Sequence, residues 1–255
     1  MLKKLTHAGI DLAYDRRGSG TPLVLIHGYP LDHSIWDEVA GLLENDFDLI
    51  IPDVRGFGES TTVDESYTMT DLAGDMAAIL DSLGLEKAAF AGHSMGGYVA
   101  LAFAKAFPDR ISGLSLLASQ TAGDAPDRKE GRYKTAAEVA EKGVQLVADA
   151  MTDKLSPNQH VRDIIRPLMG KQSVAGVTGT LKAMAEREDL SSFLASFTHP
   201  LVLVHGTADE LIPPDRAREI KALVPSAHLV ELAGAGHMPM MEQPQQTAEA
   251  LKLLK

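Results

Sequence analysis

The 255 residues are 45% hydrophobic, include no cysteine and carry a formal net charge of −11. A chain of this length can bury a sizeable core as one large domain or as one domain with an insertion. The negative charge argues against nucleic acid or an anionic membrane surface as partner. Without cysteine, disulfides and thiolate metal sites are excluded. Residues 1–7 lack the apolar segment of a signal peptide and no apolar run approaches a membrane span, so we predict a cytoplasmic protein.

The first fifty or so residues predict a hairpin followed by two buried strands. Residues 2–16 contain two short strand-like pieces joined by a tight turn. Residues 22–28 and 48–53 have consecutive apolar residues without the alternation of a half-exposed strand, which is typical of strands covered on both faces. The segment between them predicts a helix over 34–43.

The alternation continues through the next seventy residues. We expect a helix from Thr70 to Leu83, capped by Gly84, then a strand over 88–91. A helix over 97–107 and a strand over 111–118 follow. Strands that alternate with helices predict a mostly parallel α/β sheet.

Residues 120–198 interrupt this pattern, because they contain no convincing strand and are rich in alanine, lysine and glutamate. Four helices are predicted, near 134–152, 157–169, 173–187 and 190–196. Ser156 is the expected N-cap of the second, with Pro157 as its first helical residue. An independent helical domain is the alternative to an insertion. We favour a helical cap inserted into the sheet, since strands resume directly afterwards.

The last part of the chain returns to alternating elements: a strand over 201–206, a helix over 214–223, a strand over 228–232 and a helix over 245–254. The sequence thus predicts a core formed by residues 1–119 and 199–255, with residues 120–198 as the cap.

The most informative stretch is Gly92-x-Ser94-x-Gly96, which joins a predicted strand to a predicted helix. A reversal this sharp leaves no room for side chains on either flank of the serine. It holds the serine in a strained conformation and lifts its hydroxyl clear of the sheet. The amide of Met95 falls at a helix N-terminus, where negative charge is favoured. This combination suits a nucleophilic serine.

Functional groups in an open parallel sheet gather beyond the carboxyl ends of the strands. The residues expected there are Gly28, Tyr29, Asp53, Ser94, Ser119, Asp209 and His237. They include a nucleophile, a carboxylate and an imidazole in the chain order Ser, Asp, His. Four motifs agree with that order: His27-Gly28-Tyr29-Pro30, Asp53-x-Arg55-Gly56-x-Gly58-x-Ser60, Gly92-His93-Ser94-Met95-Gly96-Gly97, and Gly206-Thr207-x-Asp209 with Gly236-His237. Over essentially its whole length the chain resembles an α/β-hydrolase, which implies an eight-stranded, mostly parallel sheet with a cap after the sixth strand.

The chemistry assigns a role to each residue. Ser94 needs a neutral imidazole to accept its proton, and His237 is the candidate. Asp209 would orient that ring and stabilise the imidazolium. The oxyanion needs two amides, one from Met95 and, by resemblance to the family, one from Tyr29. No cofactor or metal is expected.

Several residues compete for these roles. Glu210 and Asp124 are the other conceivable acids, although Glu210 should face away from the site. His93 is interpreted as a structural residue that packs beneath the turn. His27 is expected to form hydrogen bonds within the oxyanion loop, the segment from Gly28 that carries the Tyr29 amide. Whether the Tyr29 phenol contacts the substrate is not predicted.

Two further predictions concern side chains around the site. Asp53 and Arg55 are interpreted as a structural ion pair. Met151, Met169 and Met184 could line an adaptable apolar pocket in the cap, although filling of the core explains them equally well.

The predicted function is hydrolysis of carboxylic esters with small to medium acyl or aryl groups through an acyl-enzyme. The chain resembles small bacterial carboxylesterases and enol-lactonase-like hydrolases, so a lactonase of the enol-lactone or acyl-homoserine lactone type is the alternative. A triad-bearing ligand receptor and a cofactor-free perhydrolase are further hypotheses. The serine at position 94 excludes the epoxide hydrolases and haloalkane dehalogenases that resemble this fold, because they need aspartate there. We expect a small-molecule substrate and a monomer or homodimer.

Overall fold

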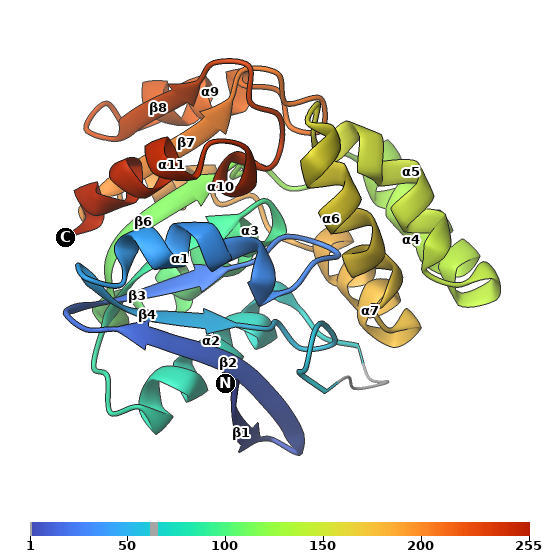
Figure 1. Cartoon of the computed structure of the whole chain (residues 1–255), viewed down its shortest axis with the longest axis horizontal. Coiled ribbons are helices and arrows are strands. Elements are labelled where there is room, and N and C mark those ends of the chain that lie inside the picture. The colour runs from blue at the N-terminus through green and yellow to red at the C-terminus, as the bar shows by residue number, and fades with distance from the viewer. Residues whose placement is uncertain (1, 62–65) are drawn as a thin grey trace.

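In the computed structural model, which describes residues 2–61 and 66–255, eight strands form a single sheet (Figure 1). The strand order is β1-β2-β4-β3-β5-β6-β7-β8. The strands are β1 (Lys3–His7), β2 (Ile10–Gly18), β3 (Thr21–Ile26), β4 (Phe47–Pro52), β5 (Ala88–His93), β6 (Ile111–Leu117), β7 (Leu201–Gly206) and β8 (His228–Leu232). The pairs β1–β2 and β2–β4 are antiparallel and the other five pairs are parallel, so the predicted mostly parallel sheet is confirmed. Met1 and residues 62–65 belong to the predicted core segment 1–119 but lie outside the described residues.

The central strands are buried on both faces because the sheet has a hydrophobic core on each side. Along β3, Leu23 and Leu25 pack into one core and Val24 and Ile26 into the other, as the two-residue period of a strand requires. This is why the sequence of β3 is continuously apolar rather than alternating.

Helices cover the two faces of the sheet. The helix α1 (Asp37–Leu43) packs against α11 (Pro244–Leu251) on one face, and α2 (Met69–Ser82) packs against α3 (Met95–Ala106) on the other (Figure 1). A further helix, α9 (Asp215–Leu223), contacts β7 and β8. None of the described helices combines the length and the apolar content needed to cross a membrane.

Between β6 and β7 the described chain forms five helices rather than the predicted four. They are α4 (Pro126–Lys142), α5 (Gln145–Leu155), α6 (Gln159–Gly170), α7 (Val174–Ala185) and α8 (Ser191–Ala195). The helix predicted over 134–152 is wrong as a single element, because Gly143 takes a φ of +86° and ends α4 before α5 begins. Figure 1 shows α4 to α7 gathered beside the sheet; we call these four the helical layer.

The predicted cap of α6 is also wrong. Ser156 does not cap the helix; its Oγ instead accepts a hydrogen bond from the amide of Asn158. The side chain of Asn158 accepts from the amide of His160 and is the true N-cap. Asparagine is as good an N-cap as serine, so two adjacent candidates left the boundary ambiguous.

Other boundaries shift by small amounts. The helix predicted from Thr70 begins at Met69, because Thr68 and Asp71 form a capping box. The helix predicted over 34–43 opens with a 3-10 turn, His33–Trp36.

At the C-terminus, the helix predicted over 245–254 begins at Pro244 and closes with another 3-10 turn, Lys252–Leu254. The short helix α10 (Pro239–Glu242) had no sequence prediction.

Candidate active site

Ser94 lies on a turn between β5 and α3 that only small flanking residues permit. Its φ of +51° is in the region that side chains other than glycine rarely adopt, and such strain costs about 1–3 kcal/mol. A Cβ on Gly92 would lie 2.2 Å from the carbonyl oxygen of Gly96, so the turn closes only because position 92 has no side chain.

The neighbouring strand end fixes this turn. The amide of Ser94 donates to the carbonyl of Leu117 at 2.8 Å, and Ser119 Oγ donates to the carbonyl of Ser94 at 2.8 Å. The Ser94 residue is partly exposed, and its hydroxyl makes no hydrogen bond within the described residues. The strained backbone is therefore held in place while the hydroxyl stays available.

The loop after β3 packs directly against the turn. A Cβ on Gly96 would meet the carbonyl oxygen of Ile26 at 2.3 Å, and a Cβ on Gly28 would meet Nδ1 of His93 at 2.4 Å. The amides of Tyr29 and Met95 both lie in these two adjoining segments, and neither donates to an acceptor in the described part of the chain. Two unpaired N–H groups in neighbouring segments are what an oxyanion hole requires.

His27 stabilises this loop, as the sequence predicted. Its Nε2 accepts from the amide of Val54 at 2.9 Å and its Nδ1 donates to the carbonyl of Gly28 at 3.0 Å. Both bonds need a neutral ring, because one ring nitrogen must accept while the other donates. Complete burial also favours the neutral ring, since it lowers the pKa of His27.

Asp209 and His237 meet as predicted. The Nδ1 atom of His237 donates to Oδ2 of Asp209 at 2.7 Å, while both residues are buried. The other carboxylate oxygen accepts from the amides of Leu211 and Ile212, at 2.9 and 3.0 Å. Burial alone would raise the pKa of Asp209, but the charge of His237 and hydrogen bonds from His205, His237 and the Ile212 amide hold it far below its usual range. The carboxylate is thus ionised at neutral pH.

Two contacts from distant segments and one from a neighbouring residue hold the loop that carries His237. Its amide donates to the carbonyl of Leu155 at the end of α5, at 2.9 Å, and its carbonyl accepts from His93 Nε2 at 2.8 Å. Glu242 accepts from the amides of Gly236 and Met238, at 2.8 and 3.1 Å. The imidazole position therefore depends on the strand β5 and on the helical layer.

The structural interpretation of His93 agrees with these contacts. Its ring is fully buried and lies 5.0 Å, centroid to centroid, from the His237 ring. Burial and the charge of His237 hold the pKa of His93 well below its ordinary value. His93 is neutral, with the proton on Nε2, where it meets the His237 carbonyl.

Hydrogen bonds connect the three residues of the predicted triad only in part. Asp209 bonds directly to His237, and His237 bonds directly to His93, the residue before Ser94. Within the described residues, however, no hydrogen bond links the Ser94 hydroxyl to the His237 ring. Hydrogen bonds of this kind are often formed only when substrate is bound.

The rival acids lie elsewhere. Asp124 is enclosed by arginines, with Arg187 Nη1 at 2.7 Å and Arg132 Nε bonded to its other oxygen. Glu210 is exposed. The predicted ion pair of Asp53 with Arg55 is wrong. Arg55 instead forms a bidentate salt bridge with Asp75, at 2.6 and 2.7 Å, because α2 presents a buried carboxylate to it.

Asp53 instead binds the segment at the start of α1. Its Oδ1 accepts from the amide and from Nδ1 of His33, at 2.9 and 2.7 Å, and its Oδ2 accepts from the amide of Glu59 at 2.9 Å. Asp32, His33 and Asp53 place potential metal-ligand atoms within 4.8 Å of one another. Because amide N–H groups already occupy both carboxylates, we assign this group a structural role.

Sequence reasoning missed Glu242 and Leu155. Glu242 follows His237 by five residues, a spacing that a tight turn brings together, so the signal was present. Leu155 acts through a backbone carbonyl, for which no residue type is required and no sequence signal exists.

The comparisons with known proteins agree with this architecture. Residues 21–244 match the model of the alpha/beta hydrolase fold family, so the chain belongs to that family. It is 34% identical to an esterase from Thermogutta terrifontis, solved with malate bound, which it matches with a TM-score of 0.94 over 99% of this chain and 97% of that one. An enol-lactonase from Burkholderia xenovorans shares the fold, with a TM-score of 0.91 and 24% identity over 99% of each chain.

A longer curated relative matches as well. The chain is 34% identical, over 91% of its length, to the dihydrolipoyllysine-residue acetyltransferase component of the acetoin cleaving system of Pseudomonas putida. It spans only 62% of that protein. The family and the esterase likeness together support hydrolase activity.

The packing of Gly28 on His93 generates a first prediction. Gly28→Ala should lower the rate of hydrolysis by about 10²–10³, because the new Cβ would push the loop, and with it the Tyr29 amide that we predict to bind the oxyanion, away from the turn. The matched control is Gly41→Ala in α1, where a Cβ meets nothing within 4 Å; it should keep full activity and gain about 0.5–1 kcal/mol of stability. Wild-type rates in Gly28→Ala would contradict the packing argument.

Burial of neutral His93 generates a second prediction. Below its unfolded-state pKa of about 6.5, the unfolded chain binds a proton at His93 that the folded chain excludes, so acid must destabilise the fold. The free energy of unfolding of the wild type should fall more steeply than that of His93→Gln as the pH drops from 7 to 5, by up to about 1.4 kcal/mol per pH unit. Urea titrations of both proteins measure the difference. Equal slopes would show that His93 is protonated in the folded state.

Proposed function

We propose that the chain is a serine hydrolase of carboxylic esters that acts through Ser94, His237 and Asp209. The observation that carries the proposal is the 2.7 Å bond between His237 and Asp209 on a loop that His93 ties to the strand bearing Ser94. The Nδ1 bond fixes the tautomer and leaves Nε2 as the proton acceptor. A rotation of the Ser94 side chain, whose hydroxyl makes no other hydrogen bond in the described residues, would complete the triad.

The reaction follows from these positions. Ser94 Oγ attacks the ester carbonyl while His237 Nε2 takes its proton, and the carbonyl electrons move onto the oxygen. The amides of Tyr29 and Met95 stabilise that oxyanion, at roughly 10²–10³ in rate for each donor. Collapse expels the alcohol, which receives the proton from His237. Water then attacks the acyl-enzyme by the same steps and releases the acid.

The helical segment supplies the remaining part of the proposal. Residues 120–198 would act as a cap on a core formed by 1–119 and 199–255, because the last residue of α5 contacts the loop of the proposed base. A pocket of about 530 Å³ lies between Tyr29 and the helical layer, and Met151 is one of its lining residues. Met169 is buried in a hydrophobic core, and Met184 accepts a hydrogen bond from Arg132 at 3.5 Å. A lactone would use the same chemistry, with the alcohol still tethered.

Replacement of the nucleophile tests the proposal. Ser94→Ala should lower turnover of 4-nitrophenyl acetate or butyrate by about 10⁴-fold or more and leave the melting temperature nearly unchanged. The matched control is Ser115→Ala in β6, which removes a buried hydroxyl that has no partner in the described residues and should keep full activity. Activity retained in Ser94→Ala would remove Ser94 from the mechanism. A wild type that releases one equivalent of product and then stops would favour a receptor.

A further inference from the structure

The pocket beside the oxyanion loop is built mostly by the helical layer. Tyr29 and Leu211 border it from the core side, and the rest of its lining comes from α4, α5 and α7. Leu211 lies two residues after Asp209 and donates its amide to that carboxylate at 2.9 Å. The pocket is therefore contiguous with both the oxyanion loop and the loop of the proposed acid.

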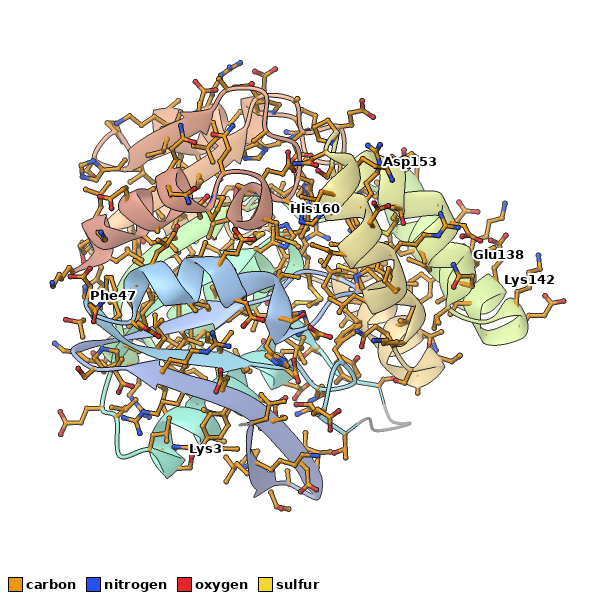
Figure 2. All side chains as sticks on the ribbon, in the orientation of Figure 1. Lys3, Phe47, Glu138, Lys142, Asp153 and His160 are labelled. Atoms are coloured by element: carbon orange, nitrogen blue, oxygen red, sulfur yellow. The ribbon has the colours of Figure 1, made fainter. Side chains whose placement is uncertain are left out.

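The charge of this lining is opposite to that of the chain. Three cationic side chains, Arg128, Arg132 and Lys154, face one carboxylate, Glu138, whereas the whole chain carries −11. Glu138 lies on α4, one turn before Lys142 (Figure 2). A cationic pocket in an acidic protein concentrates positive potential at one place.

Asp124 neutralises only part of this positive charge. It is a single carboxylate with a fully buried side chain, and it pairs with three arginines: Arg187 at 2.7 Å, Arg132, and Arg128 at 3.6 Å. Arg132 uses Nε for Asp124 and Nη1 for the sulfur of Met184. Its Nη2 makes no hydrogen bond in the described part of the chain. One N–H pair of Arg132, a residue that lines the pocket, is therefore unpaired within the described residues.

The phenol of Tyr29, a residue that lines the same pocket, is a second unpaired donor. Tyr29 is 7% exposed, and its Oη is buried with no partner among the described residues. An unpaired buried hydroxyl costs about 1–3 kcal/mol. Burial raises the pKa of Tyr29 far above its usual value, and the charge of Arg132 opposes that shift. The phenol is thus protonated, close to Arg132, and able to donate.

We propose that this pocket recognises a carboxylate on the substrate, with Arg132 and the Tyr29 phenol as its principal donors. The assignment rests on the proposed esterase function and narrows its substrates to esters that carry a second, ionised carboxyl group. The backbone amide of Tyr29 serves the reacting carbonyl and its side chain serves the distant carboxylate, so one residue sets the spacing between the two. Guanidinium and phenol donors together match a carboxylate better than any neutral group, because both bonds are charge-assisted.

The wild-type protein tests this without any substitution. Mono-4-nitrophenyl glutarate and 4-nitrophenyl pentanoate have acyl chains of equal length and differ in the terminal carboxylate. The glutarate should be preferred in kcat/KM by about tenfold or more, chiefly through a lower KM, as expected for a hydrogen bond to a charged group. A second pair, 4-acetoxybenzoate and 4-acetoxybenzamide, places the carboxylate on the alcohol side. The preference should shrink as salt is raised.

Substitutions of the pocket arginines test whether this pocket binds the carboxylate. Arg132→Gln should reduce the preference for the charged ester about tenfold or more, and Arg128→Gln serves the same purpose if the first variant fails to fold. The matched control is Lys142→Gln, which removes one charge from the same helix outside the pocket lining and should leave the preference unchanged.

Each outcome decides the question. Hydrolysis of all four esters with no preference in either pair overturns the carboxylate assignment alone, as does a preference that survives both arginine variants. If the wild type hydrolyses none of the esters, or if Ser94→Ala hydrolyses them as fast as the wild type, the proposed function is overturned. The carboxylate assignment then falls with it.

Discussion

The close approach of three loops at the carboxyl ends of the strands is the constraint on which the site depends. Gly28 lies against the ring of His93, Gly96 against the carbonyl of Ile26, and Gly206 against the carbonyl of Gly236, each at a distance that leaves no space for a Cβ. These contacts bring together the loop after β3 that carries the proposed oxyanion donor Tyr29, the turn at Ser94 and the loop of His237. His93 joins the last two directly, through its bond to the His237 carbonyl. A buried, neutral histidine thus connects the proposed nucleophile to the proposed base.

Much of this arrangement could be predicted from the sequence, because the signals are local. The buried strands are continuous apolar runs, and the turn at Ser94 requires glycine on both sides. The sequence places Ser94, Asp209 and His237 after three different strands, and the parallel topology then puts all three at one edge of the sheet. The meeting of Asp209 with His237 needed only that topology and a glycine-rich loop after β8.

The rest depends on contacts between distant segments, which the sequence does not encode locally. Asp53 and Arg55 are two residues apart yet bind different partners, because α2 offers Asp75 and the start of α1 offers His33. Ser156 and Asn158 are both good caps, and tertiary packing decided between them. The link from Leu155 to His237 uses backbone atoms alone. The charge of the pocket likewise emerges only when α4 and α5 are folded beside Tyr29.

The central claim is that the Ser94 hydroxyl, the His237 ring and the amides of Tyr29 and Met95 converge on one reacting carbon. A crystal structure of the protein treated with an alkyl 4-nitrophenyl phosphonate, which mimics the tetrahedral intermediate, measures this convergence directly. The account predicts phosphorus bonded to Ser94 Oγ, with the phosphoryl oxygen about 2.7–3.1 Å from both amide nitrogens and His237 Nε2 within hydrogen-bond reach of Oγ. An adduct on another residue, or a phosphoryl oxygen that points away from the two amides, would contradict it.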